Sequence, residues 1–242
     1  MIRQLARWVV LLLAAFISLQ LYFVARIALM RWVDPQSTTF QRSEIWRLWH
    51  EHGRIAWSQQ WVDGAQIADT LKRAVIASED AGFVDHTGVE WEAIERAWDR
   101  NQRAQTAHER RPPTRRKGPP KVVGGSTITQ QLAKNLFLSG ERTLPRKAQE
   151  FVITWTLEAL LDKRRILEIY LNSVEWGEGV FGAQAAAQHY HRVDAARLSP
   201  WASARLAVML PAPKRFERNP GSPYVSGRAA TIAARMQDVE LP

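Results

Sequence analysis

An apolar run close to the N-terminus is the feature that most limits what this chain of 242 residues can become. Residues 8–25 carry no charged side chain, and they are apolar apart from Ser18 and Gln20. An α-helix of this length rises about 27 Å, which is close to the thickness of the hydrocarbon core of a bilayer. The sequence therefore predicts an N-terminal anchor, residues 1–34, with a transmembrane helix at about 8–25.

A cleaved signal peptide is the alternative for the same run. Its apolar region is usually 7–15 residues long, which is shorter than the run here, and no convincing small-x-small cleavage site precedes Arg26. An uncleaved anchor is therefore favoured. Arg3 and Arg7 on one side are matched by Arg26 and Arg31 on the other, so charge bias alone does not settle the topology.

Residues 35–242 have the composition of one helical domain. The whole chain is 46% apolar, enough to bury a core, and it contains no cysteine, which excludes a disulfide framework, a thiolate metal site and a cysteine nucleophile. No alternating strand series is visible, so the predicted fold class is mainly α. Apolar spacing and capping residues predict a juxtamembrane helix and turn within 40–61, and helices at 66–78, 89–98, 127–138, 145–160, 163–171, 181–190 and 200–209, the last capped by Ser199 and opened by Pro200. The expected apolar faces consist of Trp91, Ile94 and Trp98 in 89–98, of Ile128, Leu132 and Leu136, pointing inward, in 127–138, and of Phe151, Val152, Trp155 and Leu160 in 145–160.

Most of the net charge of +9 is concentrated in residues 99–121. This stretch holds eight Arg or Lys against two acidic side chains, together with four prolines, which predicts a basic, Pro-rich mobile loop. Because the excess is local and follows a membrane anchor, we expect it to meet anionic headgroups or diphosphates and expect no nucleic-acid partner. A solvated linker is the simpler alternative.

Two glutamates are the candidate catalytic residues. Glu79 and Asp80 end the helix predicted at 66–78, where the helix dipole disfavours negative charge, and Glu150 lies on the helix predicted at 145–160. Paired carboxylates serve chemistry at a sugar anomeric carbon. If the leaving group is a diphosphate, one carboxylate suffices as a general base and cations must neutralise the leaving group. Candidate cations are Lys134, Arg142, Arg146 and Lys147, although solvated helix faces carry similar residues.

A glycine pair precedes the helix predicted at 127–138. Gly124 and Gly125 allow a close approach of the backbone to a ligand, Ser126 is a candidate N-cap, and free N–H groups at such a helix start attract phosphate. An ordinary glycine-preceded helix entry would produce the same pattern.

Several segments in order resemble the motifs of the peptidoglycan glycosyltransferases, over about residues 65–210. They read E-D-A-G-F-V-D-H-T-G from Glu79, G-G-S-T-I-T-Q-Q-L-A-K-N-L-F from Gly124, R-K-A-Q-E ending at Glu150, K-R-R-I-L-E-I-Y-L-N from Lys163, and G-E-G-V-F-G-A from Gly177. Members of this family stand alone or are fused to a penicillin-binding transpeptidase domain. No serine here has a lysine three positions later, so the chain resembles the monofunctional biosynthetic type and no transpeptidase activity is expected.

The resemblance implies a lysozyme-like helical glycosyltransferase domain. Its expected reaction is the polymerisation of lipid II into linear β-1,4 glycan strands, with release of undecaprenyl diphosphate. The anchor would hold the domain on the periplasmic face of the cytoplasmic (inner) membrane, with lipid II and the growing glycan strand as substrates. Cell-wall synthesis or division proteins are the protein partners that such an enzyme suggests. The resemblance also implies a divalent cation, Mg²⁺ or Mn²⁺, for which no ligand spacing is visible in the sequence.

The resemblance further implies roles for single residues. Glu79 matches the general base, and Glu150 matches a second essential glutamate near the donor diphosphate. The positions that hold sugar and diphosphate groups are Ser126, Gln131, Lys134, Arg142 and Lys147. Residues that match the first motif, with either a structural role or direct contact with the substrate, are Asp80, Phe83 and His86. Residues expected to shape the fold are Tyr170, Asn172 and Gly182. Two departures are Glu90, where the family usually has aspartate, and the length and basicity of 99–121, which corresponds to a mobile flap in the family.

Two other functions remain open from the sequence. A lysozyme-like lytic muramidase would use the same two carboxylates to cleave glycan, but it would not need the cations around Lys134 and Lys147. A non-catalytic, membrane-tethered scaffold would bind anionic polymers through residues 99–121, and Glu79 and Glu150 would then be dispensable.

Overall fold

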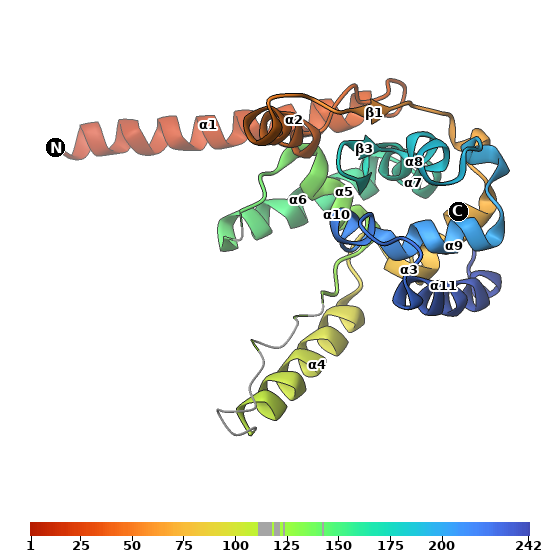
Figure 1. The fold of residues 1–242 in the computed structure, drawn as a ribbon. Coiled ribbons are helices and arrows are strands. Elements are labelled where there is room, and N and C mark those ends of the chain that lie inside the picture. Colours follow the sequence, from red (N-terminus) through yellow and green to blue (C-terminus); the bar gives the residue numbers. More distant parts are fainter. Residues whose placement is uncertain (111–117, 119–121, 123, 142) are drawn as a thin grey trace.

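The structure, a computed structural model, describes residues 1–110, 118, 122, 124–141 and 143–242 (Figure 1). In this part of the chain the fold is mainly helical, as predicted. The helices and strands are α1 (Ile2–Leu29), α2 (Thr39–His52), β1 (Ser58–Gln59), η1 (Gly64–Gln66), α3 (Asp69–Glu79), α4 (Trp91–Glu109), α5 (Ile128–Phe137), α6 (Leu144–Leu160), α7 (Lys163–Ser173), β2 (Glu175–Gly177), β3 (Val180–Phe181), α8 (Ala183–His191), η3 (Ala195–Arg197), α9 (Pro200–Met209), α10 (Pro213–Phe216), α11 (Pro223–Arg235) and η4 (Met236–Asp238).

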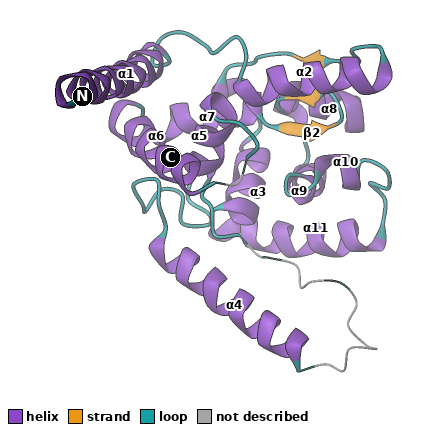
Figure 2. Cartoon of the chain, turned by 90° about the vertical axis from the view of Figure 1, so that its left-hand side faces the viewer, coloured by secondary structure: helices purple, strands orange, loops and turns teal. Residues whose placement is uncertain are grey.

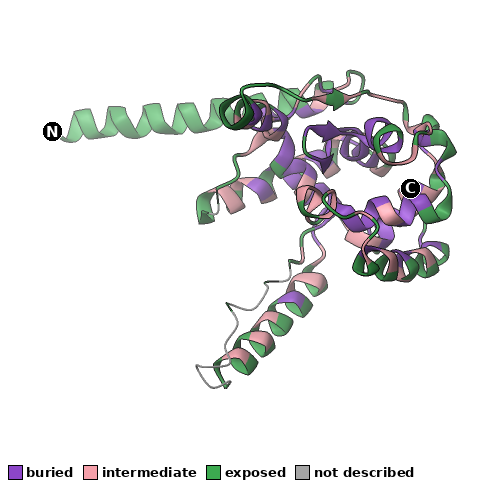
Figure 3. Cartoon of the chain, viewed as in Figure 1, coloured by how far each residue is buried: buried purple, intermediate pink, exposed green. Residues whose placement is uncertain are grey.

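The core lies where α3, α5, α7, α8 and α9 meet, while α1 and α4 project away from the body in different directions (Figures 1 and 3). Helix α9 packs between α3 and α11, and α5 packs against α2, α6 and α7. Three predicted positions on α5, namely Ile128, Leu132 and Leu136, are buried as expected from their spacing. Ser199 caps α9 and Pro200 begins it, which is also as predicted.

A small sheet, absent from the prediction, lies beside α8 (Figure 2). Strand β3 pairs in parallel with β1 and antiparallel with β2, giving the order β1-β3-β2. The helix predicted at 181–190 begins only at Ala183, because Gly182 adopts a non-helical φ of 81°, and a Cβ at this position would lie 2.8 Å from the carbonyl oxygen of Asn172. The strands are two or three residues long, too short to show an alternating pattern in the sequence.

The anchor helix is longer than predicted and its last turns belong to the domain. Helix α1 is long and apolar enough to cross a membrane. Its first turns are exposed, whereas Phe23 and Ile27 are buried in the core, with Phe23 edge-on to Phe137 of α5. The side-chain amides of Gln20 and Gln149 exchange two hydrogen bonds, of 3.0 and 2.9 Å. Because α1 supplies buried residues to the core of the domain, a retained anchor is favoured over a cleaved signal peptide.

The predicted loop at 99–121 is wrong in its first half. Residues 99–109 continue α4, because they are rich in Ala, Gln, Arg and Glu, and the first proline comes only at Pro112. Residues 111–117 and 119–121 lie outside the described part of the chain. The face of this helix that carries Trp91, Ile94 and Trp98 is not buried, since Trp91 and Trp98 are exposed and Ala97 is the buried residue of α4. Figure 2 shows why: α4 leaves the body and covers nothing along most of its length.

The predicted apolar face of α6 is wrong as well. We expected Phe151, Val152, Trp155 and Leu160 to face the core, but Val152 and Trp155 are exposed. The buried face instead combines apolar and polar side chains at three- and four-residue spacing, namely Glu150, Ile153, Thr154 and Leu157. The aromatic side chains form a surface stripe, in which Phe151 stacks on Trp91 of α4 with ring centroids 6.0 Å apart.

The packing of the anchor predicts a difference between two isoleucines on one helix. Ile27 of α1 is fully buried, so Ile27→Ala should lower the free energy of unfolding of the domain by about 2–4 kcal/mol. Ile17 is 56% exposed on the same helix, so Ile17→Ala should leave that free energy unchanged. Denaturant unfolding of the full chain in detergent, followed by tryptophan fluorescence, measures both. Equal values for the two variants would contradict the docking of the anchor on the domain.

Candidate active site

Glu79 is held at the C-terminal end of α3 by neutral hydrogen-bond donors. Its Oε2 accepts a hydrogen bond of 3.0 Å from Gln131 Nε2, and its Oε1 accepts one of 3.4 Å from Ser78 Oγ. The half-buried carboxyl group lines a cavity of about 300 Å³ together with Ser126. Burial raises the pKa of Glu79, and the neighbouring charge of Asp80 raises it further, although the two donors partly offset these effects. Glu79 therefore holds a proton more readily than an exposed glutamate does.

Asp80 connects the end of α3 to the beginning of α5. Its carboxylate is buried, with Oδ2 accepting from the backbone N–H of Ile128 (2.9 Å) and Oδ1 lying 2.8 Å from His86 Nε2. The Nδ1 atom of His86 accepts a hydrogen bond from the backbone N–H of Gly88 (3.1 Å). The proton of the ring is therefore on Nε2, which donates a hydrogen bond to Asp80. Of the two roles left open for Asp80 and His86, these contacts support the structural one.

The N-terminus of α5 is capped by Thr127, and the prediction of Ser126 as the cap is wrong. The Oγ1 atom of Thr127 accepts from the backbone N–H of Gln130, and the side chain of Gln130 accepts from the backbone N–H of Thr127, which completes a capping box. Ser126 is instead exposed and lines two adjacent cavities. A Cβ on Gly125 would lie 2.7 Å from the carbonyl oxygen of Ala93, so this glycine permits close packing against α4.

Glu150 has a different environment from that of Glu79. It is 3% exposed on α6, and its Oε2 accepts from the guanidinium of Arg146 (2.8 Å) while its Oε1 accepts from the ammonium of Lys147. Two cations therefore occupy both oxygens of one buried carboxylate. The ammonium of Lys147 also lies 5.0 Å from the ring centroid of Phe151. Glu150 therefore holds the two cations in place through its ion pairs with both of them.

The predicted substrate-binding residues come together around one cavity of about 310 Å³, next to the cavity of Glu79. Ser126 lines both cavities. Gln131 lines the cavity of about 310 Å³ and also donates a hydrogen bond to Glu79 in the neighbouring cavity. We call the cavity of about 310 Å³ the cationic cavity. Its lining includes the predicted residues Ser126, Gln131, Lys134, Lys147 and Glu150, together with Arg146. Arg142 lies outside the described residues. A base in one cavity and a cationic lining in the next suit the attack of a hydroxyl on a donor with an anionic leaving group.

Gln130 was not identified from the sequence as a residue of this region, and the contact of Tyr170 with the site was not predicted. Gln130 is buried, and its Nε2 and the Nε of Arg146 have no hydrogen-bond partner among the described residues, although both side chains line the cationic cavity. The T-x-x-Q pattern of a capping box could have located Gln130. Tyr170 was expected to shape the fold, but its hydroxyl donates to Gln131 Oε1 (3.0 Å) and so reaches the site.

Neither of the two acidic clusters that could hold a metal ion within the described residues fits a divalent cation. Asp80, His86 and Glu90 offer ligand atoms within 4.8 Å of one another. However, both oxygens of Asp80 accept hydrogen bonds, and neither ring nitrogen of His86 has a free lone pair. In the exposed second cluster, Glu51, His52 and Glu178, both carboxylates form ion pairs with Arg47. The expected Mg²⁺ or Mn²⁺ therefore stays a prediction.

The fold and the site define a class of protein. A helical domain that carries a helix long and apolar enough to cross a membrane places one carboxylate with a raised pKa beside a cavity lined by cations. This combination suits a transferase that passes a group to a hydroxyl acceptor from a donor with an anionic leaving group.

Comparison with known proteins agrees with this class. A model of the transglycosylase family matches residues 50–237. A biosynthetic peptidoglycan transglycosylase of Burkholderia pseudomallei is 53% identical over 244 residues, which cover 99% of this chain and 90% of the relative. Another, of Paraburkholderia phytofirmans, is 50% identical over 241 residues, which cover 98% and 94%. The chain belongs to the transglycosylase family and is a glycosyltransferase of peptidoglycan synthesis, with the lysozyme-like domain that we expected.

The buried ion pair on α6 generates a stability prediction. Arg146→Met should lower the free energy of unfolding by about 1–3 kcal/mol, because it removes one of two partners from a buried carboxylate. Adding Glu150→Gln should restore part of the loss, since the uncompensated charge is then absent. Arg197→Met breaks an exposed pair with Asp194 and should change the value by no more than about 0.5 kcal/mol. Denaturant unfolding in detergent compares the three, and equal losses for Arg146→Met and Arg197→Met would contradict the burial of the pair.

Proposed function

We propose that this transglycosylase polymerises lipid II into linear β-1,4 glycan strands, with Glu79 as the general base. The observation that supports this proposal best is the placement of Glu79 at the edge of a cavity that meets the cationic cavity at Ser126. An acceptor sugar in the first cavity would present its 4-hydroxyl to Glu79. The donor diphosphate would then lie among the cations of the second cavity.

The chemical step requires one proton acceptor. The acceptor oxygen bonds to the anomeric carbon of the donor as its proton passes to Glu79, and the bond from that carbon to the diphosphate oxygen breaks with its electron pair. Undecaprenyl diphosphate leaves as an anion and needs no proton at neutral pH. Because burial raises the pKa of Glu79, this carboxylate is a stronger base than an exposed glutamate.

Lys134, Arg146 and Lys147 line the cavity where the leaving group would gather charge. Arginine and lysine stabilise phosphate oxygens by charge-assisted hydrogen bonds, and fixed cations add no reorganisation cost during the reaction. Glu150 would act by holding Arg146 and Lys147, since both of its oxygens are occupied by them. Arg142, outside the described residues, would add a further cation.

The lytic muramidase is less well supported by the same geometry. A hydrolase with two catalytic carboxylates needs both of them to face the scissile bond, whereas Glu150 is buried under two cations. For a scaffold, nothing would require the pKa of Glu79 to be raised in a cavity.

With this function, we place the anchor in the cytoplasmic (inner) membrane with the domain facing the periplasm, where lipid II and the growing strand are its substrates. Cell-wall synthesis and division proteins remain proposed partners.

A polymerisation assay tests the proposal directly. Detergent-solubilised full-length protein and labelled lipid II should yield glycan polymer, and Glu79→Gln should reduce the rate by at least about 100-fold, the usual scale for loss of acid–base catalysis. Glu240→Gln removes the same charge from an exposed position and should behave like the parent protein. Running each reaction with and without Mg²⁺ or Mn²⁺ tests the expected cation. Soluble cleavage products would favour the muramidase, and equal behaviour of Glu79→Gln and the parent would favour the scaffold.

The protonation of Glu79 predicts the acidic side of the pH profile. The base must be ionised, so kcat/KM should fall as the pH decreases through the pKa of Glu79. Since burial raises that pKa, the half-maximal point should lie above the ordinary glutamate value of 4.5. Initial rates of polymerisation from about pH 4 to pH 9 measure it. A midpoint at or below 4.5 would contradict the assignment of Glu79 as a buried base.

A further inference from the structure

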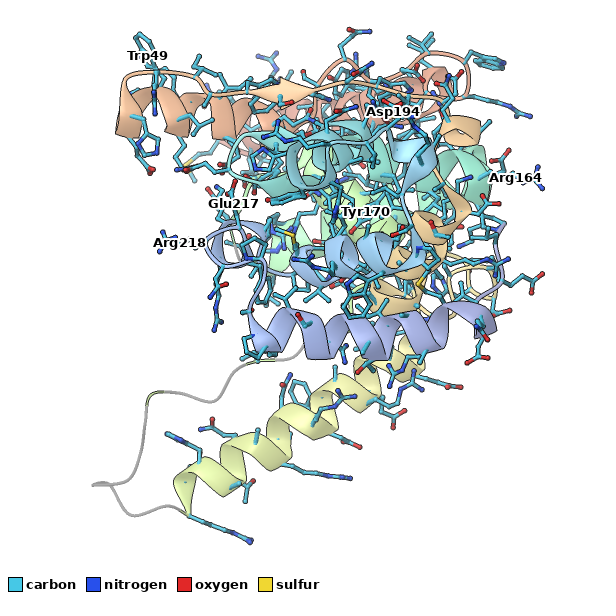
Figure 4. The ribbon with its side chains drawn as sticks, turned by 45° about the vertical axis from the view of Figure 1, so that its right-hand side comes forward. Trp49, Arg164, Tyr170, Asp194, Glu217 and Arg218 are labelled. Carbon is cyan, nitrogen blue, oxygen red and sulfur yellow. The ribbon has the colours of Figure 1, made fainter. Side chains whose placement is uncertain are left out.

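We infer that Tyr170 is a positioning residue for Glu79 and acts through the side-chain amide of Gln131. This inference rests on the proposed role of Glu79 as the base. Tyr170 lies on α7, in the interior of the molecule (Figure 4), and its ring is fully buried. It does not line the cavity of Glu79 or the cationic cavity, so contact with the substrate is not its role.

A chain of two hydrogen bonds joins the phenol to the carboxylate. The Oη atom of Tyr170 donates to Gln131 Oε1 at 3.0 Å, and Gln131 Nε2 donates to Glu79 Oε2 at 3.0 Å. The three side chains come from α7, α5 and α3, so the chain crosses the centre of the fold. Gln131 forms hydrogen bonds with both of the other side chains. Its amide therefore couples the phenol of Tyr170 to the carboxyl group of Glu79.

The orientation of the amide follows from the chemistry of its two neighbours. An ionised carboxylate only accepts hydrogen bonds, so Glu79 requires the NH₂ group of Gln131 to face it. The Oε1 atom then faces Tyr170, whose hydroxyl must donate. Burial raises the pKa of Tyr170 well above its usual value, and the charges of Glu79 and Asp80 act in the same direction. The phenol therefore keeps its proton and remains a donor throughout the working pH range.

Removal of the hydroxyl would free the amide to turn over. Gln131 could then present Oε1 to Glu79, an arrangement that repels the carboxylate and accepts a hydrogen bond from the carboxylic acid. The hydroxyl of Tyr170 therefore favours the ionised form of Glu79, which is the form that a general base needs. The effect should be large at low pH and small where Glu79 is ionised in any case.

Other charged groups around Glu79 do not change when Tyr170 is altered. Asp80 directly follows Glu79 at the end of α3 and raises the pKa of Glu79, whereas Arg228 of α11 lowers it. The cavity of Glu79 is also lined by Glu90, Arg96, Arg100 and Arg235. Since all of these remain in a Tyr170→Phe protein, a shift of its pH profile reports the hydroxyl alone.

The test is the pH dependence of kcat/KM for Tyr170→Phe with lipid II in detergent. We expect the acidic midpoint to move up by about one pH unit, the scale of one hydrogen bond to a charged group. Below the midpoint the rate should fall about 10-fold, and on the alkaline plateau it should lie within about twofold of the parent rate. A merely structural role of Tyr170 would lower the rate by the same factor at every pH, and that result would overturn the inference.

Tyr190→Phe is the matched control. Tyr190 also donates from a largely buried phenol, but to the backbone carbonyl of Trp176 (2.9 Å), and it does not line the cavity of Glu79. Its removal should leave the acidic midpoint unchanged. A shift equal to that of Tyr170→Phe would show a general effect of losing a buried hydroxyl and would overturn the inference.

A second variant tests the path through Gln131. Gln131→Met removes both hydrogen bonds at nearly constant length and should raise the midpoint in the same direction, and adding Tyr170→Phe should produce no further shift. A further shift in the double variant, or no shift in Gln131→Met, would overturn the inference. If thermal unfolding shows that Tyr170→Phe does not fold, the result for Gln131→Met alone is decisive. The Glu79→Gln protein separates the two claims: if it polymerises lipid II, the proposed function fails, whereas if it is inactive and the Tyr170→Phe profile matches the parent, only the inference fails.

Discussion

The arrangement of the site depends on the buried carboxylate of Asp80. It accepts from the first-turn N–H of α5 at Ile128, where a helix N-terminus attracts negative charge, and from the ring of His86. This contact fixes the end of α3 against the beginning of α5. Glu79, one residue earlier, is thereby placed opposite Gln131, one turn into α5. The two carboxylates that stand against the dipole of α3 are thus accommodated by the neighbouring helix, which explains why the chain tolerates them at that position.

The two glutamates of the site have opposite environments, and this difference assigns their chemistry. Glu79 receives hydrogen bonds from the neutral side chains of Gln131 and Ser78, and burial raises its pKa, so it can exchange a proton. Glu150 forms ion pairs with the cations of Arg146 and Lys147, one at each of its two oxygens. A fixed anion that organises two cations beside a cavity suits the binding of a diphosphate. Proton transfer and charge neutralisation are therefore carried by separate groups, as the proposed reaction requires.

The sequence predicted the helices of the core and several residues that line the two cavities, such as Glu79, Ser126 and Lys147, but it did not predict which faces are buried at the periphery. Ile128, Leu132 and Leu136 lie inward because α5 is surrounded by other helices, so apolar spacing decides its orientation. Helices α4 and α6 are covered on fewer sides, and there aromatic residues such as Trp91 and Trp155 remain on the surface while Glu150 is buried. Periodicity identifies an apolar stripe, but it does not say what covers it. The contact of Tyr170 with Gln131 joins α7 to α5, and no local pattern reports such a pairing.

The anchor and the cationic cavity are mechanically connected through α6. Helices α1 and α6 run side by side (Figure 1), and the amide pair of Gln20 and Gln149 satisfies the polar groups of a glutamine that would otherwise be costly within an apolar run. Gln149 directly precedes Glu150, so the helix that contacts the anchor also carries the carboxylate that holds Arg146 and Lys147. A substrate held in the bilayer by its lipid chain, as proposed, presents its diphosphate at a depth set by the membrane. In the proposed arrangement α1 lies in the membrane and also contacts α6, so that this contact would set the height of the cations above the bilayer.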